Sequence, residues 1–285
     1  MPIYQAVVLA LVQAATEFLP VSSTAHLILV PWLLGWEDHG LLFDIALHLG
    51  TLVAVLIYFA KTWIRLLFLA FGRRVLAPAP DDPDRDLYAN PKLFWYLVAA
   101  TFPAGIAGLL LKDYVETVFR SPFVVGFMLI AIGLVLAWAE RAGTFRRDLG
   151  HVSFLDAMII GCAQALALVP GTSRSGITIS AGLFRGMDRA SAARFSFLLS
   201  SPIILGASAK AALDVFLGEG IPPDMRAPFA VGLVVSAVAG YAVIALFLRY
   251  LQRATLKIFI VYRIIFGIIV LALAFLWRFP GAAYL

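Results

Sequence analysis

The chain of 285 residues contains little charge and almost no cysteine. Asp, Glu, Lys and Arg make up 14% of it, 62% is hydrophobic, and the mean hydropathy is +0.94. This composition excludes an ordinary soluble domain, in which about a quarter of the residues are charged. Cys162 is the only cysteine, which excludes an intrachain disulfide and a cysteine-based metal site. The apolar runs are continuous rather than alternating, which excludes a β-barrel and predicts an all-α polytopic membrane protein.

Basic residues are absent from the start of the chain, since the first Lys or Arg is Lys61. A secretory signal peptide begins with a basic region, and here Gln13 and Glu17 also interrupt the first apolar run, so no signal peptide is expected. The net charge of +5 comes from Lys and Arg gathered in a few loops. This is typical of topology signals and of contacts with anionic headgroups, so the bilayer is an expected partner and nucleic acid is not.

The chain repeats one plan in two halves, 1–140 and 154–285. Each half begins with two short helices separated by a polar break, which predicts a re-entrant hairpin, and continues with three segments able to span a membrane. The hairpins are expected at 3–36 and 154–186, and the spans at 41–60, 92–111, 122–139, 189–213, 229–248 and 258–277. Such breaks are tolerated at membrane depth only where they are buried in protein or line a cavity. The two halves would form a single membrane domain.

Three spans per half is an odd number, so the second half is predicted to be inverted relative to the first. Lys and Arg are concentrated in the loops 61–92, 141–152 and 249–257, whereas the alternate loops hold only Lys112, Arg120 and Arg226. The positive-inside rule places the rich loops in the cytoplasm and therefore both chain ends outside. The two hairpins would enter from opposite sides, and their polar breaks would meet near the bilayer midplane.

The second break, Pro170 to Thr178, is a polar run inside apolar sequence. Pro170 ends the incoming helix, and the next helix begins with unpaired backbone N–H groups, which together with an arginine form an anion site. An ordinary interhelical loop is the alternative, but an arginine at membrane depth is costly and usually functional. The candidate substrate-binding and catalytic residues here are Gly171, Thr172, Ser173, Arg174, Ser175 and Thr178.

The first break supplies groups that the second lacks. A carboxylate and a histidine suit proton transfer, and a hydroxyl suits a nucleophile. Glu17 could also hold a divalent cation, Mg²⁺ or Ca²⁺, through oxygen. Aligned at an offset of 150 residues, Ser22 pairs with Thr172 and Ser23 with Ser173. The candidates here are Gln13, Glu17, Ser22, Ser23, Thr24 and His26.

Several of these residues have plainer interpretations. Glu17 could pair with Arg174 to neutralise a buried charge, and His26 could hydrogen-bond a carbonyl. Ser22, Ser23 or Thr24 could cap the following helix, and Gln13 could only bond across helices. Asp44 and His48 lie four residues apart on one helix face; a structural pair is favoured over an extension of the site.

At these residues the chain resembles the bacterial undecaprenyl pyrophosphate phosphatases of the bacitracin-resistance type. The motifs read Gln13-Ala-Ala-Thr-Glu17, Pro20-Val-Ser-Ser-Thr-Ala-His26 and Pro170-Gly-Thr-Ser-Arg-Ser-Gly-Ile-Thr178, and the likeness extends to Phe195-Ser-Phe-Leu-Leu and Tyr262-Arg263. The resemblance implies hydrolysis of undecaprenyl pyrophosphate to undecaprenyl phosphate and inorganic phosphate, recycling the carrier lipid for cell-wall synthesis. It also implies inverted re-entrant repeats in the bacterial inner membrane, an outward-facing site, dependence on a divalent cation and a tendency to form homodimers.

Two residues depart from the pattern. Many members have Glu where this chain has Gln13, and a neutral amide is a weaker cation ligand, which puts a two-carboxylate metal site in doubt. Ala25 stands where Gly is common, which restricts the backbone beside His26.

The expected roles follow from this chemistry. Arg174 and the N–H groups after Gly171 would hold the pyrophosphate, Ser23 would be the nucleophile, His26 would shuttle protons, and Glu17 would activate the nucleophile or bind the cation. Direct attack by water, assisted by Glu17 and His26, is an alternative. Two other functions use the same site: a transporter or flippase of polyprenyl phosphate, and a lipid-binding paralogue without activity, which Gln13 alone favours.

Overall fold

In the computed structural model, the residues described are 1–37, 40–73, 79, 82–111, 121–217 and 220–276. These residues form helices, turns and one isolated bridge between Arg147 and Met187, and no strand is found within them. The predicted connection around 112–120 and the last residues, from 277 onward, lie outside the described residues. The chain is therefore an all-α protein, as the sequence predicts.

The helices of the first half lie close to their expected positions. They are α1 (Ile3–Phe18), α2 (Ser23–Leu34), α3 (Gly40–Tyr58), α4 (Ala60–Ala70), α5 (Leu93–Leu110) and α7 (Pro122–Ala142). The second half contains α8 (Phe154–Ala165), α9 (Arg174–Phe184), α10 (Arg189–Leu217), α11 (Arg226–Leu251) and α12 (Lys257–Leu276). Short 3-10 helices, η1 (Arg85–Ala89), η2 (Leu149–His151), η3 (Leu166–Leu168) and η4 (Pro223–Met225), lie between them.

Five of these helices, α5, α7, α10, α11 and α12, are each long and apolar enough to cross a membrane. The sixth expected span, 41–60, corresponds to α3, which bends by 65° into α4 at a short break. The protein is a polytopic helical membrane protein, with five or six candidate spans among the residues described.

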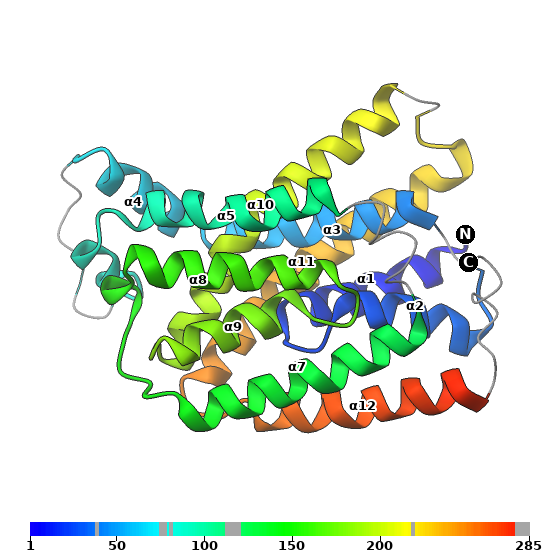
Figure 1. Ribbon diagram of the computed structural model, residues 1–285. Coiled ribbons are helices and arrows are strands. Elements are labelled where there is room, and N and C mark those ends of the chain that lie inside the picture. The colour runs from blue at the N-terminus through cyan, green and yellow to red at the C-terminus, as the bar shows by residue number, and fades with distance from the viewer. Residues whose placement is uncertain (38–39, 74–78, 80–81, 112–120, 218–219, 277–285) are drawn as a thin grey trace.

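The two short hairpins enter the bundle from opposite ends. Figure 1 shows α1 beginning at the end where α12 finishes, and α8 beginning at the other end. The helix packing is also paired: α1 packs on α11 as α5 packs on α8, and α3 packs on α11 as α5 packs on α10. Two structurally equivalent halves would give this pairing, and their inverted relation in the membrane stays a prediction.

The start of α8 is set by its own sequence. Ser153 accepts a hydrogen bond from the Asp156 backbone N–H, and the Asp156 carboxylate accepts one from the Ser153 N–H, which makes a capping box. Asp188 similarly accepts from the Ser191 N–H ahead of α10. Further along α8, a side chain at Gly161 would lie 2.3 Å from the Ala100 carbonyl oxygen, so glycine is what lets α8 approach α5 closely.

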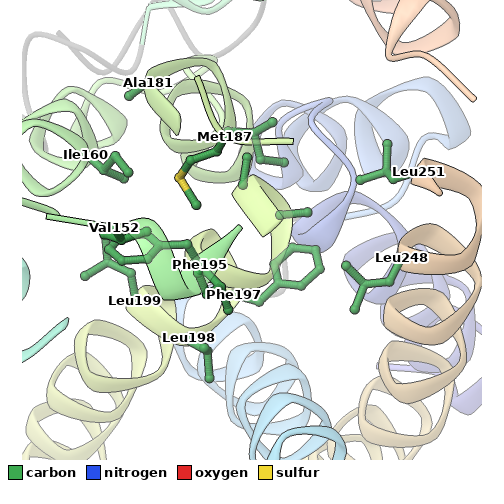
Figure 2. Packing of buried hydrophobic residues seen from close by; sticks show 14 of the residues in the cluster. Val152, Ile160, Ala181, Met187, Phe195, Phe197, Leu198, Leu199, Leu248 and Leu251 are labelled. Atoms are coloured by element: carbon green, nitrogen blue, oxygen red, sulfur yellow. The ribbon is translucent and has the colours of Figure 1, made fainter. Parts of the chain in front are cut away.

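A large apolar cluster fixes α8, α9, α10 and α11 at the end of the bundle away from the chain termini. Phe195 and Phe197 of α10 are fully buried there, and Leu248 and Leu251 of α11 approach them (Figure 2). Burial of large aromatic side chains stabilises such a contact strongly. The hairpin formed by α8 and α9 is therefore anchored at its open end, which holds its polar break in the interior.

Ion pairs connect helices and the loop around η1 at the same end of the bundle. Arg194 of α10 contacts Asp84 at 2.8 Å and Asp86 at 2.9 Å, and Arg65 contacts Asp82 at 2.6 Å. Burial raises the pKa of Asp86, although the charge of Arg194 acts against that shift. The acidic residues around η1 thus hold the loop between α4 and α5 against α10.

Candidate active site

A cavity of about 200 Å³ lies where the two polar breaks meet. Its wall is formed by both hairpins together with α3, α5 and α10. The polar lining residues are Glu17, Ser22, Ser23, Thr24, His48, Gln164, Gly171, Ser173 and Arg174. The meeting of the two breaks, inferred from the sequence, is thus observed.

Glu17 is the centre of the hydrogen bonding in this cavity. Ser23 Oγ donates to Glu17 Oε2 at 2.8 Å, and Gln13 Nε2 donates to the same oxygen at 3.1 Å. Arg174 Nη2 donates to Glu17 Oε1 at 3.0 Å, from the other hairpin. A hydroxyl, a carboxylate and a guanidinium are therefore in direct contact, and the plain interpretation of Glu17 as the partner of Arg174 is confirmed.

The backbone of both breaks turns sharply just before a helix begins. Ser22, immediately before α2, has φ 76°, and Ser173, immediately before α9, has φ 66°. Positive φ is uncommon for residues other than glycine, and such strain gathers at functional sites. Each turn leads directly into a helix, whose first N–H groups have no partner within the helix backbone. Since these turns are equivalent, Ser22 matches Ser173 and the offset of 150 residues is wrong by one.

Polar atoms around the cavity are buried without a hydrogen-bond partner among the described residues. Arg174 has two such donors, Nε and Nη1, beside the one that contacts Glu17. The others are Gln13 Oε1, Thr172 Oγ1, and both Nε2 and Oε1 of Gln164. Buried polar groups are nearly always paired, and unpaired ones need an explanation such as a ligand. Unpaired guanidinium donors are suited to an anion.

The structure does not place His26 on the cavity wall. Its Nδ1 lies 2.7 Å from the Ser22 carbonyl oxygen, and its Nε2 lies 2.6 Å from Tyr262 Oη. Because a carbonyl only accepts, Nδ1 donates and neutral Nε2 accepts from the tyrosine. The ring also stacks on Phe266, at 4.5 Å between centroids. His26 supports the backbone of Ser22, the carbonyl contact that the sequence offered as an alternative.

Three predicted substrate-binding residues also lie behind the cavity wall. Ser175 Oγ donates to the Leu19 carbonyl at 3.0 Å, which ties the second hairpin to the first. Thr178 Oγ1 donates to the Arg174 carbonyl at 2.7 Å and lies 2.6 Å from Ser196 Oγ. Thr172 is fully buried next to them. Ser175 thus joins the two breaks, and direct contact with a substrate stays a prediction for all three residues.

His48 reaches the site, which the sequence did not favour. Its Nδ1 donates to the Asp44 backbone carbonyl at 2.8 Å, so the expected link within α3 exists. Its Nε2, however, lies 3.9 Å from Glu17 Oε2, and the residue lines the cavity. The interpretation as a structural pair is therefore incomplete for His48. Its spacing from Asp44 was visible in the sequence, but the direction of the helix face was not.

Arg263 of α12 is a second buried arginine that the sequence reasoning did not single out. It is fully buried and donates to the carbonyls of Pro20 at 3.1 Å, Gly171 at 2.9 Å and Thr172 at 3.0 Å. It also contacts the Leu129 carbonyl of α7 at 3.2 Å. One guanidinium thus joins both breaks. An arginine in the middle of an apolar span was the available signal.

A divalent cation is compatible with the groups present. No set of three or more His, Cys, Asp or Glu side chains able to hold a metal occurs in the part of the chain described. Glu17 nevertheless lies beside the unpaired amide oxygen of Gln13. Mg²⁺ is often held by one or two protein oxygens together with substrate phosphates. These two side chains would fit that mode of binding.

The fold and the cavity define a class: a multi-pass helical membrane protein with an internal cavity in which a serine, a carboxylate and an arginine are in contact. A family model described as "Bacitracin resistance protein BacA" matches residues 6–269. The chain belongs to this BacA family.

Curated relatives match nearly the whole chain. A protein of Pelotomaculum thermopropionicum named "Undecaprenyl-diphosphatase" is 43% identical over 274 residues, covering 96% of this chain and 97% of the relative. Proteins with the same name are 45% identical in Desulforudis audaxviator, covering 96% and 98%, and 47% identical in Elusimicrobium minutum, covering 94% and 97%. Its family and its apolar helices together make this chain a multi-pass protein of the bacterial membrane.

Proposed function

We propose that the protein hydrolyses undecaprenyl pyrophosphate to undecaprenyl phosphate and inorganic phosphate, recycling the lipid carrier for cell-wall synthesis. One observation carries the proposal: the Ser23 hydroxyl donates to Glu17 within a cavity where Arg174 keeps two unpaired donors. An activated hydroxyl next to an anion site is what phosphoryl transfer requires. The names of the relatives support the same reaction.

Ser23 Oγ would act as the nucleophile. It would attack the terminal phosphorus, its proton would pass to Glu17 Oε2, and the bond from that phosphorus to the bridging oxygen would break. Undecaprenyl phosphate leaves with the bridging oxygen, and water then hydrolyses the phosphoserine to release inorganic phosphate. Direct attack by water, with Glu17 as the base, gives the same products. The contact of 2.8 Å between Ser23 and Glu17 favours the covalent route.

Arg174 would hold the pyrophosphate and stabilise the charge of the transition state. Its Nη2 contacts Glu17, while Nε and Nη1 have no partner among the described residues. The helix starts after Ser22 and Ser173 add backbone N–H groups and positive dipole ends. Thr24, Gly171 and the hydroxyls near Arg174 would complete the phosphate contacts.

Glu17 and the amide oxygen of Gln13 would hold a divalent cation, Mg²⁺ or Ca²⁺. When bound with substrate, such an ion supplies positive charge to the phosphate oxygens. Gln13 also donates to Glu17, which orients the carboxylate toward Ser23. His26 would keep the Ser22 turn in place and so position the neighbouring nucleophile.

The apolar part of the cavity suits the lipid. Ala104 of α5 and Ile203 and Ile204 of α10 line it opposite the polar groups. We place the site on the outer side of the bacterial inner membrane, with both chain ends outside, because the Lys- and Arg-rich loops lie at the other end of the bundle. A homodimer is also proposed, and cross-linking in native membranes tests it.

Phosphate release from purified protein tests the function. In detergent with Mg²⁺ or Ca²⁺, the wild type should release phosphate from polyprenyl pyrophosphate, and Ser23→Ala and Arg174→Ala should lose this activity. Thr101→Ala is a control, because that hydroxyl bonds only within α5 at 2.9 Å. A wild type that releases no phosphate but moves labelled lipid between leaflets would overturn the proposal in favour of a flippase. Neither activity would indicate a lipid-binding paralogue.

A further inference from the structure

Gln164, near the end of α8, is a buried amide for which neither the sequence motifs nor the proposed chemistry accounts. Its side chain is 2% exposed and borders the cavity. Both amide atoms, Nε2 and Oε1, lack a hydrogen-bond partner among the described residues. A buried amide that bonds to nothing destabilises the fold, and a hydrocarbon side chain of the same shape would not. A ligand that pairs with the amide would explain its presence.

The position of Gln164 indicates which part of a substrate it would meet. Ala167 and Leu168, three and four residues further along the chain, line the same cavity and are apolar. Arg174, Ser23 and Glu17 form the polar part of the lining. Gln164 therefore marks the boundary between the polar and the apolar wall.

The apolar side of this boundary is formed by residues of two helices. Ala104 of α5 and Ile204 of α10 are buried and line the cavity. An isoprenoid chain attached at the polar wall could extend along these two helices.

We propose that Gln164 binds the proximal phosphate of the substrate, the one that stays on the lipid, where the isoprenoid chain turns toward α5 and α10. This inference rests on the proposed function. The terminal phosphate must lie beside Ser23 and Arg174 to react, so the proximal phosphate falls at the polar–apolar boundary. The amide Nε2 donates to a phosphate oxygen there. Because this contact is made both before and during the reaction, it contributes to binding rather than to turnover.

The test compares Gln164→Met with a matched control, Gln5→Met, which replaces a buried glutamine of α1 that donates a hydrogen bond to Tyr4 Oη. Gln164→Met should raise KM for polyprenyl pyrophosphate about tenfold and change kcat by less than about threefold, as expected for loss of a hydrogen bond to a charged group. Its melting temperature in detergent should equal or exceed that of the wild type. A purely structural role predicts the opposite: a lower melting temperature with KM unchanged.

Product inhibition identifies the phosphate. Gln164→Met should raise the inhibition constant of a polyprenyl monophosphate about tenfold, and leave that of inorganic phosphate unchanged. If Gln164→Met instead raises the inhibition constant of inorganic phosphate, Gln164 binds the terminal phosphate and the proposal is wrong. If neither inhibition constant nor KM changes, water or another group pairs with the amide, and the proposal is also wrong. Phosphate release by the wild type in the same assays tests the proposed function itself. A failure of that function is therefore distinguishable from a failure of the proposal for Gln164.

Discussion

The two polar breaks share a backbone and divide the chemistry between them. Each has a serine with positive φ, Ser22 or Ser173, immediately before a helix. The first residue of the following helix is Ser23 in one case and Arg174 in the other. Equivalent positions in the two hairpins therefore present a serine hydroxyl and a guanidinium, and both contact Glu17.

The two serines with positive φ, Ser22 and Ser173, differ in their hydrogen bonds. Ser173 Oγ accepts from the Gly176 N–H at 3.2 Å, so the second break is closed by its own side chain. Ser22 makes no such cap, and its carbonyl is instead held by His26. The turn at Ser173 thus has a cap from its own side chain, whereas the turn at Ser22 is held by His26, which contacts Tyr262 of α12. Arg263 of α12 contacts the backbone of both breaks.

The largest effect is expected from removing the nucleophile. Ser23→Ala should lower kcat about 10⁴-fold or more, the scale seen when a catalytic serine is lost. Ser22→Ala, one residue earlier, should cost far less, because Ser22 Oγ makes no cap bond. Phosphate release under saturating substrate measures both. Equal losses of kcat in Ser23→Ala and Ser22→Ala would contradict the proposal that Ser23 is the nucleophile.

Arg174 tests the other helix start. Arg174→Ala should lower kcat about 10³-fold, because a charge that stabilises the phosphoryl transition state is lost. Arg174→Lys should fall between the alanine variant and the wild type, since lysine keeps the charge without the planar fork. Single-turnover phosphate release measures both. A lysine variant as active as the wild type would show that the unpaired Nε and Nη1 donors are not used.

Arg263 tests the link between the breaks. Arg263→Lys should lower kcat about 10²-fold, because a lysine cannot contact the Pro20 and Gly171 carbonyls together and a shift of about 1 Å between the loops is that costly. The melting temperature should fall as well, since buried carbonyls lose their donors. Arg253→Lys, at an exposed position, is the control. Unchanged activity with a lowered melting temperature would restrict Arg263 to a structural role.

Gln13 tests how well the first break binds a divalent cation. Gln13→Glu should lower the concentration of divalent cation needed for half-maximal activity about tenfold, because a second carboxylate is a better ligand than an amide. Turnover at saturating cation should change little. A metal titration of phosphate release measures this shift. An inactive wild type that becomes active as Gln13→Glu would favour the lipid-binding paralogue instead.

Tyr262 gives the smallest effect. Tyr262→Phe removes the hydroxyl that lies 2.6 Å from His26 Nε2 but keeps the stacked rings. Loss of one hydrogen bond of about 1 kcal/mol predicts a fall of about fivefold in kcat/KM. Tyr241→Phe on α11 is the matched control. A fall as large as that of Ser23→Ala would mean that His26 takes part in proton transfer directly.

Most of the fold could be predicted from the sequence, because long apolar segments have one stable form in a bilayer. The expected spans at 92–111 and 258–277 match α5 and α12 closely. The bend between α3 and α4 could not be predicted, since no proline or glycine marks Phe59. That bend depends on how the two arms pack.

The site was predictable where its residues share a short motif. Glu17, Ser23 and Arg174 were identified from local composition, because an arginine and hydroxyls inside apolar sequence are costly unless they serve a site. His26 was identified too, but the direction in which its side chain points was not. The sequence gives the helix on which a side chain lies, whereas neighbouring helices decide what it faces.

The sequence by itself determined an all-α membrane protein with two interrupted helical hairpins and predicted an anion site at their breaks, because hydropathy and helix-breaking residues act locally. Only the tertiary structure decided that Glu17 joins Ser23 to Arg174, that His48 and Gln164 border the cavity, and that Arg263 holds both breaks. These contacts join residues far apart in the chain. Their geometry depends on helix rotation and packing, which no local pattern encodes.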